Sequence, residues 1–276
     1  MDEQSYQSDG NSWLLRIVDG SGELILDFFI WVGSLSIFAV KSVPEAFRPP
    51  FEISELTRQL YQAGWRSLPL IAASGLAVGA VMSMHTRASL ERFGAEAMIP
   101  AGLAIALFRE TGPLVASLLV AGRVGASIGA ELGAMRISEQ IDALESLAVD
   151  SFKYLVVTRI AACVLALPIL TTVMNFMGLV GGFVAENTVS GMSFSLYFNR
   201  AFSALEFLDL IPSTLKTMAS GFIIGTVSSF LGYNTTGGTE GVGRASTQSV
   251  VLSSILLILG NVLMVQLILF LFPSRG

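Results

Sequence analysis

Three ionisable residues of this sequence fall inside apolar stretches, where a charge is costly. Arg109 and Glu110 stand near the middle of residues 98–122, and Lys216 interrupts residues 210–232. If both stretches are membrane helices, a rise of ~1.5 Å per residue places Arg109 ~17 Å and Lys216 ~14 Å below the same face. Charges at this depth face protein or a wet cavity and mark a candidate functional site, with a buried structural ion pair as the alternative.

Pro113 adds an irregularity to the same stretch. Proline has no N–H group, so it cannot donate to the carbonyl of Arg109, four residues earlier. Adjacent residues do not face each other on a helix, so Arg109 and Glu110 need not form a pair. The sequence therefore predicts a kink that leaves a backbone carbonyl free beside the charges.

A second group of charges lies in residues 138–148, an acidic amphipathic segment. Its acids recur at every third position, and so do its apolar residues: Glu139, Asp142 and Glu145 against Ile141, Leu144 and Leu147. We expect Ser138 to cap this helix, with Glu139 complementing the helix dipole. Helices that rest on the inner leaflet usually carry a basic polar face. The acidic face favours docking into a groove of a protein partner, and a solvated helix on the bilayer is the alternative.

Two patterns resemble catalytic motifs but lack the residues that would do the chemistry. "GASIG", residues 125–129, fits a GxSxG nucleophile elbow, yet Ser127 falls in a predicted helix and the single histidine, His85, falls at the far end of another. "GTEGVGRA", residues 238–245, has P-loop glycines but Arg and Ala where Lys and Ser or Thr are required. We interpret it as a glycine-rich cytoplasmic turn, and we predict no catalytic residue and no ATP site in this chain.

The composition narrows the class further. The chain has 276 residues, of which 53% are hydrophobic and 13% charged, and a mean hydropathy of +0.68. These values are typical of a polytopic membrane protein. A single cysteine, Cys163, excludes an internal disulfide and a cysteine-cluster metal site. We predict no metal site and no nucleic-acid partner.

Several membrane helices are needed to position these residues. A spanning helix needs ~20 mostly apolar residues. We predict an all-α integral membrane protein in which a polar tail (1–13) and interfacial and elbow helices (14–65) precede a five-span domain (66–276). Residues 24–40 form a short apolar run that includes Asp27, so we expect them to lie in the interface. The predicted spans cover residues 67–86, 98–122, 160–185, 210–232 and 249–272.

Basic residues outside the spans predict the orientation. Lys and Arg are more frequent on the side that holds the N-terminus and residues 123–159 than on the opposite side. This excess predicts a cytoplasmic N-terminus and an external C-terminus. Residues 138–148 would then be cytoplasmic.

Small residues at helical spacing predict close contacts between helices. We interpret each set as intramolecular packing, with an oligomer contact as the alternative. The sets are Gly75/Gly79, Gly178/Gly182, Gly221/Gly225 and Gly125/Gly129/Gly133.

The longest specific pattern is "RETGPLVASLLVAGRVGASIGAELGAMRISEQIDALESLAVD", residues 109–150. It closely resembles the signature of the MlaE-type (Mla/Mce-associated) ABC permeases. "YLVVTRIAA" (154–162) and "GGTEGVGRAST" (237–247) also resemble segments of that family. Ser151 stands where the family pattern leads us to expect proline, which predicts a looser turn there. The resemblance covers most of the chain from about residue 50 onward.

This resemblance implies a transport subunit rather than an enzyme. Such a permease forms a homodimer and pairs with two cytoplasmic ATPase subunits, which bind the ATP and Mg. An external MCE-domain protein oligomer completes a phospholipid channel, often with a small STAS-domain accessory protein. The implied location is the inner membrane of a double-membraned bacterium, with a periplasmic C-terminus, and the implied role is to help maintain outer-membrane lipid asymmetry.

The resemblance also implies roles for particular residues. Residues 138–148 would be the coupling helix in the ATPase groove, with contacts from Glu139, Gln140, Ile141, Asp142, Leu144 and Glu145. From the depth of the membrane charges we further hypothesise that the dimer encloses an externally open cavity for a phospholipid. Its head would lie near Arg109, Glu110 and Lys216 and its acyl chains along Leu76, Val78 and Met82. A stand-alone ion-coupled secondary carrier, with Arg109 and Glu110 as the coupling pair, is the alternative.

Overall fold

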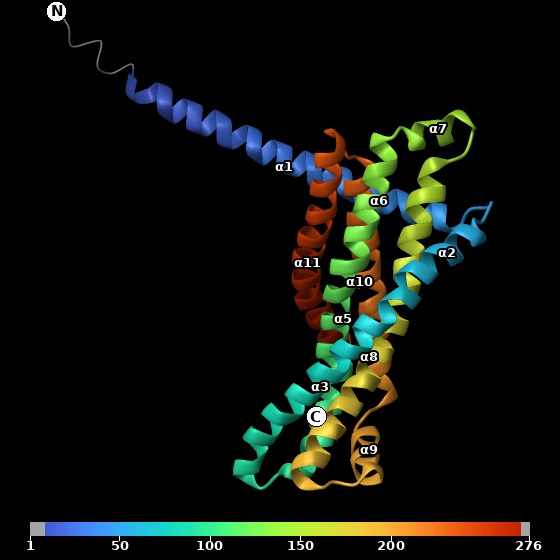
Figure 1. Cartoon of the computed structure of the whole chain (residues 1–276). Helices are drawn as coiled ribbons and strands as arrows, with labels where there is room; N and C mark the ends of the chain where they lie inside the picture. Colours follow the sequence, from blue (N-terminus) through green and yellow to red (C-terminus); the bar gives the residue numbers. More distant parts are fainter. Residues whose placement is uncertain (1–8, 272–276) are drawn as a thin grey trace, which may run out of the picture.

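The computed structural model describes the backbone of residues 9–271 and the side chains of residues 26–27, 29–206, 210–267 and 270. Within these limits the chain is all α-helical, as predicted, and contains no strand. Residues 1–8 of the predicted tail and residue 272 of the last predicted span lie outside the described residues. The helices form an elongated bundle, with α7 at one end and α9 at the other (Figure 1).

Within the described residues, six helical stretches are long and apolar enough to cross a membrane. Four of the five predicted spans overlap α3, α8, α10 and α11, and the fifth overlaps α4 and α5. The helices are α1 Asp9–Phe47, α2 Ile53–Ala63, α3 Leu68–Leu90, α4 Ile99–Ala106, α5 Gly112–Val120, α6 Ala126–Ile137, α7 Gln140–Ser146, α8 Thr158–Ser190, α9 Phe194–Ser203, α10 Phe207–Tyr233 and α11 Gly238–Leu271.

The predicted span 98–122 is part of a longer helical rod. Helices α4, α5 and α6 follow one another through two π turns, Leu107–Thr111 and Ala121–Gly125, and the helical stretch runs on to Ile137. The glycine- and alanine-rich segment after residue 122 therefore continues the span. It carries α7 to the end of the bundle (Figure 1).

The interpretation of residues 238–245 as a turn is wrong. Helix α11 begins at Gly238, and the chain turns just before it, where Gly237 and Gly238 have φ of 87° and 68°. Ala245 is buried, and the Ser246 hydroxyl donates to the carbonyl of Ala126 at 3.1 Å. This glycine-rich segment is thus the first part of α11 and packs against α6.

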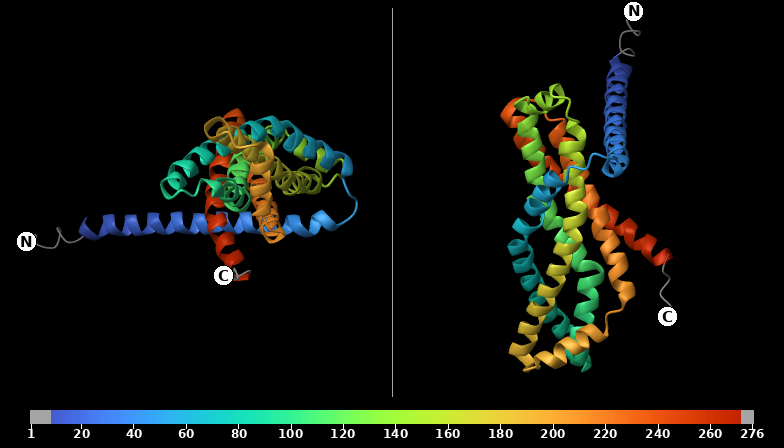
Figure 2. Two further views of the ribbon diagram at one scale, coloured as in Figure 1. Left: turned by 90° about the horizontal axis from the view of Figure 1, so that it is seen from below. Right: turned by 90° about the vertical axis from the view of Figure 1, so that its right-hand side faces the viewer.

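Helix α1 is longer than the interfacial helix predicted for residues 24–40. It begins at Asp9, inside the predicted tail, and ends at Phe47. Viewed along the bundle, α1 lies across it (Figure 2). Phe38 packs edge-on against Phe152 and Phe230, with ring centroids 5.0 and 5.4 Å away. Residues Phe29–Phe47 also have the length and composition of a span, so the interfacial placement stays a prediction.

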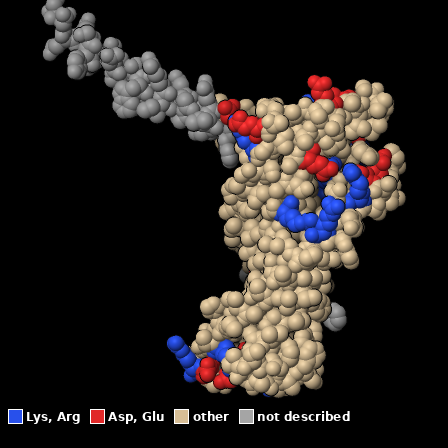
Figure 3. Space-filling model, viewed as in Figure 1, with Lys and Arg blue, Asp and Glu red and all other residues tan. Residues whose placement is uncertain are grey.

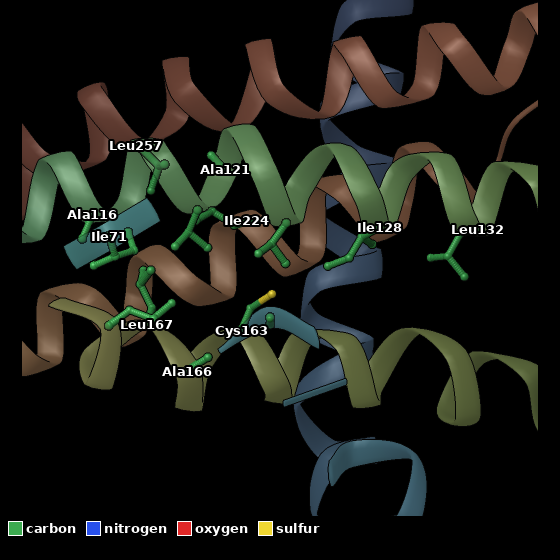
Figure 4. Packing of buried hydrophobic residues seen from close by; sticks show 14 of the residues in the cluster. Ile71, Ala116, Ala121, Ile128, Leu132, Cys163, Ala166, Leu167, Ile224 and Leu257 are labelled. Atoms are coloured by element: carbon green, nitrogen blue, oxygen red, sulfur yellow. The ribbon is translucent and has the colours of Figure 1, made fainter. Parts of the chain in front are cut away.

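The core is built around α8, which packs against α3 on one side and α10 on another. Figure 4 shows Ala166 and Leu167 of α8 among residues of the neighbouring helices, such as Ile71 of α3 and Ile224 of α10. A Cβ on Gly79 would overlap the carbonyl oxygen of Gly178, so α3 and α8 touch through their backbones there. The interpretation of the glycine pairs as intramolecular packing is confirmed for this contact.

The other predicted glycine pairs are also at contacts within the chain. A Cβ on Gly221 would lie 2.5 Å from the carbonyl oxygen of Cys163, and one on Gly225 would lie 2.7 Å from Ile160 Cα. Both glycines let α10 approach α8 closely.

Candidate functional site

The structure brings two of the three predicted membrane charges together. Lys216 Nζ of α10 lies 2.8 and 2.9 Å from the two carboxylate oxygens of Glu110. The Lys216 side chain is 3% exposed, whereas that of Glu110 is 48% exposed. Asn261 Nδ2 of α11 lies 3.5 Å from the same carboxylate. The pair thus connects the α4–α5 junction with α10 and α11, and one of its members is open to the surroundings.

The irregularity predicted at Pro113 takes the form of a π turn. The amide of Gly112 donates to the carbonyl of Leu107, five residues earlier. The carbonyl of Arg109, which Pro113 cannot pair with, lies 3.4 Å from Lys216 Nζ. The carbonyl is therefore not left free, because the buried ammonium group compensates for the missing amide.

The predicted acyl-chain contacts on α3 have neighbours other than the Glu110–Lys216 pair. These residues are Leu76, Val78 and Met82. Val78 and Met82 are half-buried and pack against the hydrophobic cluster that includes Leu103 and Leu107. Leu76 is 38% exposed. Of the three residues predicted to contact acyl chains, Leu76 is thus the most exposed.

Helix α7 occupies the middle of the predicted coupling segment, and its apolar side faces the bundle. Ile141 is fully buried and Leu144 packs against the main core cluster. Leu147, the third residue of the predicted apolar stripe, is 73% exposed. Gln140, next to the buried Ile141, is exposed.

Ser138 does not cap α7, contrary to the prediction. Its hydroxyl donates to the carbonyl of Ala134 at 2.8 Å and so belongs to the end of α6. The turn between the two helices is so short that Glu139 is the residue before α7, with φ of 58° and no side-chain cap. The left-handed conformation of Glu139 turns the chain from α6 into α7, and no serine caps α7.

Both acids of α7 make contacts within the chain. Asp142 lies 2.6 Å from Arg136. Glu145 Oε1 accepts a hydrogen bond from Ser151 Oγ at 2.6 Å and one from the hydroxyl of Tyr233 at 3.2 Å. These hydrogen bonds hold the pKa of Glu145 below its usual value. Ser151 is buried and links α7 to α10, where the sequence predicted a looser turn.

Sequence reasoning missed a charge network at the opposite end of the bundle. Glu186 of α8 is 1% exposed, accepts from Ser83 at 2.9 Å and forms an ion pair with Arg87. Arg87 also lies 3.4 Å from Glu96. The sequence did contain an indication of this network, because Glu186 is an acid just after the predicted span 160–185. Its pairing with Arg87 could be inferred only once α3 and α8 were known to be neighbours.

The membrane-length helices define a multi-pass membrane protein, which has an ion pair between its helices. The chain belongs to the MlaE permease family, whose model, described as "Permease MlaE", matches residues 56–267. The family resemblance of the sequence is confirmed.

Three relatives illustrate the range of the family. A "Probable ABC transporter permease protein" of Rickettsia felis is 39% identical over 254 residues, which cover 92% of this chain and 98% of the relative. "Protein TRIGALACTOSYLDIACYLGLYCEROL 1, chloroplastic" of Arabidopsis thaliana is 34% identical over 226 residues, or 82% of this chain and 65% of the relative. The "Intermembrane phospholipid transport system permease protein MlaE" of Haemophilus influenzae is 28% identical over 248 residues, or 89% and 94%. The chain is a transporter permease.

Proposed function

We propose that this chain is the membrane subunit of an ABC transporter that moves phospholipids between the inner membrane and an external MCE-protein channel. The transporter would help to maintain outer-membrane lipid asymmetry. The name of the Haemophilus influenzae relative supports phospholipid as the cargo. The observation that carries the proposal is α7, an exposed acidic helix anchored to the bundle by the buried Ile141.

In this proposal α7 is the coupling helix. Two cytoplasmic ATPase subunits bind ATP and Mg and receive the exposed face of α7, with Glu139, Gln140 and Asp142, in a groove. Ile141 and Leu144 face the core, and Glu145 is tied to α10 through Ser151 and Tyr233. A displacement of α7 would therefore be passed to α10, the helix that carries Lys216.

The lipid site is proposed between two copies of the chain. The dimer encloses a cavity that opens to the periplasm, in which Arg109, Glu110 and Lys216 lie near the headgroup. Leu76, Val78 and Met82 would contact acyl chains. Glu110 is half exposed while Lys216 is buried, so the carboxylate rather than the ammonium is the group open to a ligand or water.

Co-purification tests the coupling proposal. The tagged chain is expressed from its own chromosomal locus and purified in detergent. Mass spectrometry then measures how much ATPase subunit co-purifies. Replacing both Glu139 and Leu147 with Lys should lower ATPase recovery at least about tenfold. The change at Glu139 removes a contact to a charged group, worth ~1.5–3 kcal/mol, and the change at Leu147 puts a charge on an exposed apolar residue. Glu91→Lys, at the far end of α3, is the matched control. Undiminished recovery in the double variant would contradict docking through α7.

The cargo is tested separately with a photocrosslinkable phospholipid in assembled complexes. Arg109, Glu110 and Lys216 are replaced singly by Ala, and lipid crosslinking and ATP-dependent transfer are measured. If all three variants bind and transfer lipid like the wild type, these residues have no role in the cavity. A stand-alone ion-coupled carrier would instead transport without any ATPase subunit and would respond to an imposed ion gradient.

A further inference from the structure

A pocket of about 180 Å³ lies between α2, α6 and α8, away from the Glu110–Lys216 pair. This volume is roughly six times the ~30 Å³ that a water molecule occupies in the liquid, so a small ligand fits. Basic side chains gather over α2 on this face of the molecule, next to acidic ones (Figure 3). The polar residues that line the pocket include Gln59, Gln62, Arg66, Arg123, Glu131 and Arg159.

Arg159 is the feature of this pocket that packing alone does not explain. Its side chain is fully buried, and Nη1 donates to the carbonyl of Leu155 at 2.8 Å. Within the described part of the chain, Nε and Nη2 have no hydrogen-bond acceptor. Glu131 Oε1 lies 3.1 Å from Nη2, close enough for an ion pair. A buried guanidinium with unused donors is costly unless an acceptor fills the site.

Two further arginines give the pocket an excess of positive charge. Arg123 is held in place, because its Nη1 donates to Ser67 Oγ at 2.5 Å and lies 3.4 Å from the carbonyl of Gln62. Arg66 is exposed and has its guanidinium 6.0 Å from the ring centre of Tyr61. Three arginines therefore face a single carboxylate, that of Glu131, among the lining residues.

We propose that this pocket binds a phosphate group, carried either by a membrane phospholipid or by free phosphate. Planar guanidinium groups match the oxygens of phosphate in pairs, which favours phosphate over a spherical anion. All three arginines line the pocket: Arg159 supplies the buried donors, Arg123 is held in place by Ser67, and Arg66 is exposed. On the inner wall, Ile128 of α6 and Cys163 of α8 lie between their two helices (Figure 4).

The position of the pocket suits a lipid of the leaflet on the α7 side. Its lining residues Arg123 and Glu131 come after Glu110 on the helical stretch Glu96–Ile137, which leads into α7. The pocket is therefore closer to the α7 end than the Glu110–Lys216 pair. A headgroup at this level reaches the pocket from the side of the bundle. The lipid form of the inference rests on the proposed function, whereas binding of free phosphate does not.

Ligand protection of the full chain tests the inference. The chain is purified in a maltoside detergent without phosphate, and its unfolding temperature is measured with inorganic phosphate, phosphatidylglycerol or diacylglycerol. A ligand that binds only the folded state raises this temperature in proportion to its affinity. Arg66→Gln should weaken the binding of the protecting phosphate compound about tenfold, the effect of losing one charge-assisted contact. Arg92→Gln, an exposed arginine near the opposite end of α3, is the matched control.

A second variant addresses the buried group. Arg159→Lys keeps the charge but loses the planar donors, and it should also weaken phosphate binding. If this variant does not fold, Arg66→Gln still decides, because that side chain is exposed.

Each outcome has one meaning. Protection by phosphatidylglycerol but not by diacylglycerol, weakened in Arg66→Gln, assigns the site to a lipid headgroup. Protection by inorganic phosphate but not by phosphatidylglycerol, weakened in the same variant, assigns it to a free anion. The inference is overturned if neither phosphate compound protects, or if Arg66→Gln responds like the wild type. A chain that binds phosphate here but recovers no ATPase would contradict only the proposed function.

Discussion

Lys216 is a buried charge with two kinds of partner, a side-chain carboxylate and a backbone carbonyl. It pairs with the carboxylate of Glu110 and lies within reach of the carbonyl that Pro113 leaves without its helical partner. A lysine that is 3% exposed is costly to bury without such partners. The pair is therefore structural as well as a candidate for ligand contact.

Glu110→Ala should destabilise the fold by leaving the Lys216 ammonium unpaired. We expect a loss of about 1–3 kcal/mol, less than the ~3–5 kcal/mol of a fully buried pair, because the Glu110 carboxylate is half exposed. Adding Lys216→Met should restore part of the loss. The measurement is the free energy of unfolding in detergent, with Glu91→Ala as the control. A double variant less stable than the single one would show that Lys216 does not depend on Glu110.

The link from Glu145 to Ser151 and Tyr233 should make stability depend on pH. Since the pKa of Glu145 is lowered in the fold, the ionised carboxylate stabilises it above the usual value of 4.5, and this contribution is lost as the pH falls through the lowered pKa. The difference in unfolding temperature between the wild type and Ser151→Ala should therefore be constant near neutral pH and narrow in acid. Ser146→Ala, whose hydroxyl bonds to the carbonyl of Ala143, is the control. A difference that does not change with pH would contradict this link.

At the scale of the helices, backbone contact between α3 and α8 sets how the two halves of the bundle meet. Gly79 faces the carbonyl of Gly178, and a Cβ on Gly181 would overlap the carbonyl of Leu76. Lipid supplies no hydrophobic force between helices, so this closeness of approach provides the packing energy. The same contact aligns Arg87 with Glu186 at the far end.

Gly79→Ala should weaken this contact, because the new methyl group meets backbone that cannot move aside. We expect a cost of about 1–3 kcal/mol in the free energy of unfolding in detergent. Gly102→Ala is a matched control, since a Cβ there meets no atom within 4 Å. If the two variants unfolded alike, α3 and α8 would not be held by this approach.

For the molecule as a whole, we predict on which side of the membrane α1 lies. Helix α1 lies across the bundle, and we expect it to rest at the interface on the α7 side (Figure 2). Cys163 is the single cysteine, so Cys163→Ala gives a background for single-cysteine labelling. In intact cells, an impermeant maleimide should label Arg92→Cys but neither Asp27→Cys nor Gln140→Cys. Labelling of Asp27→Cys from outside would show that α1 crosses.

The sequence by itself determined the class, the approximate spans and the family. Long apolar runs must become helices in lipid, because every backbone N–H and C=O group has to be paired within the segment. The glycine spacings also foretold which helix faces pack closely, as at Gly79. These are local properties, and each can be read from ~20 neighbouring residues.

Only the tertiary structure decided which polar groups meet. The pairing of Glu110 with Lys216, the burial of Arg159 beside Glu131, and the tie from Glu145 to Tyr233 each join residues from different helices. Such contacts depend on how each helix is rotated and shifted along its neighbour. Rotation and shift are fixed by side-chain packing across the whole bundle. The spacing of residues within a single segment does not reveal this packing.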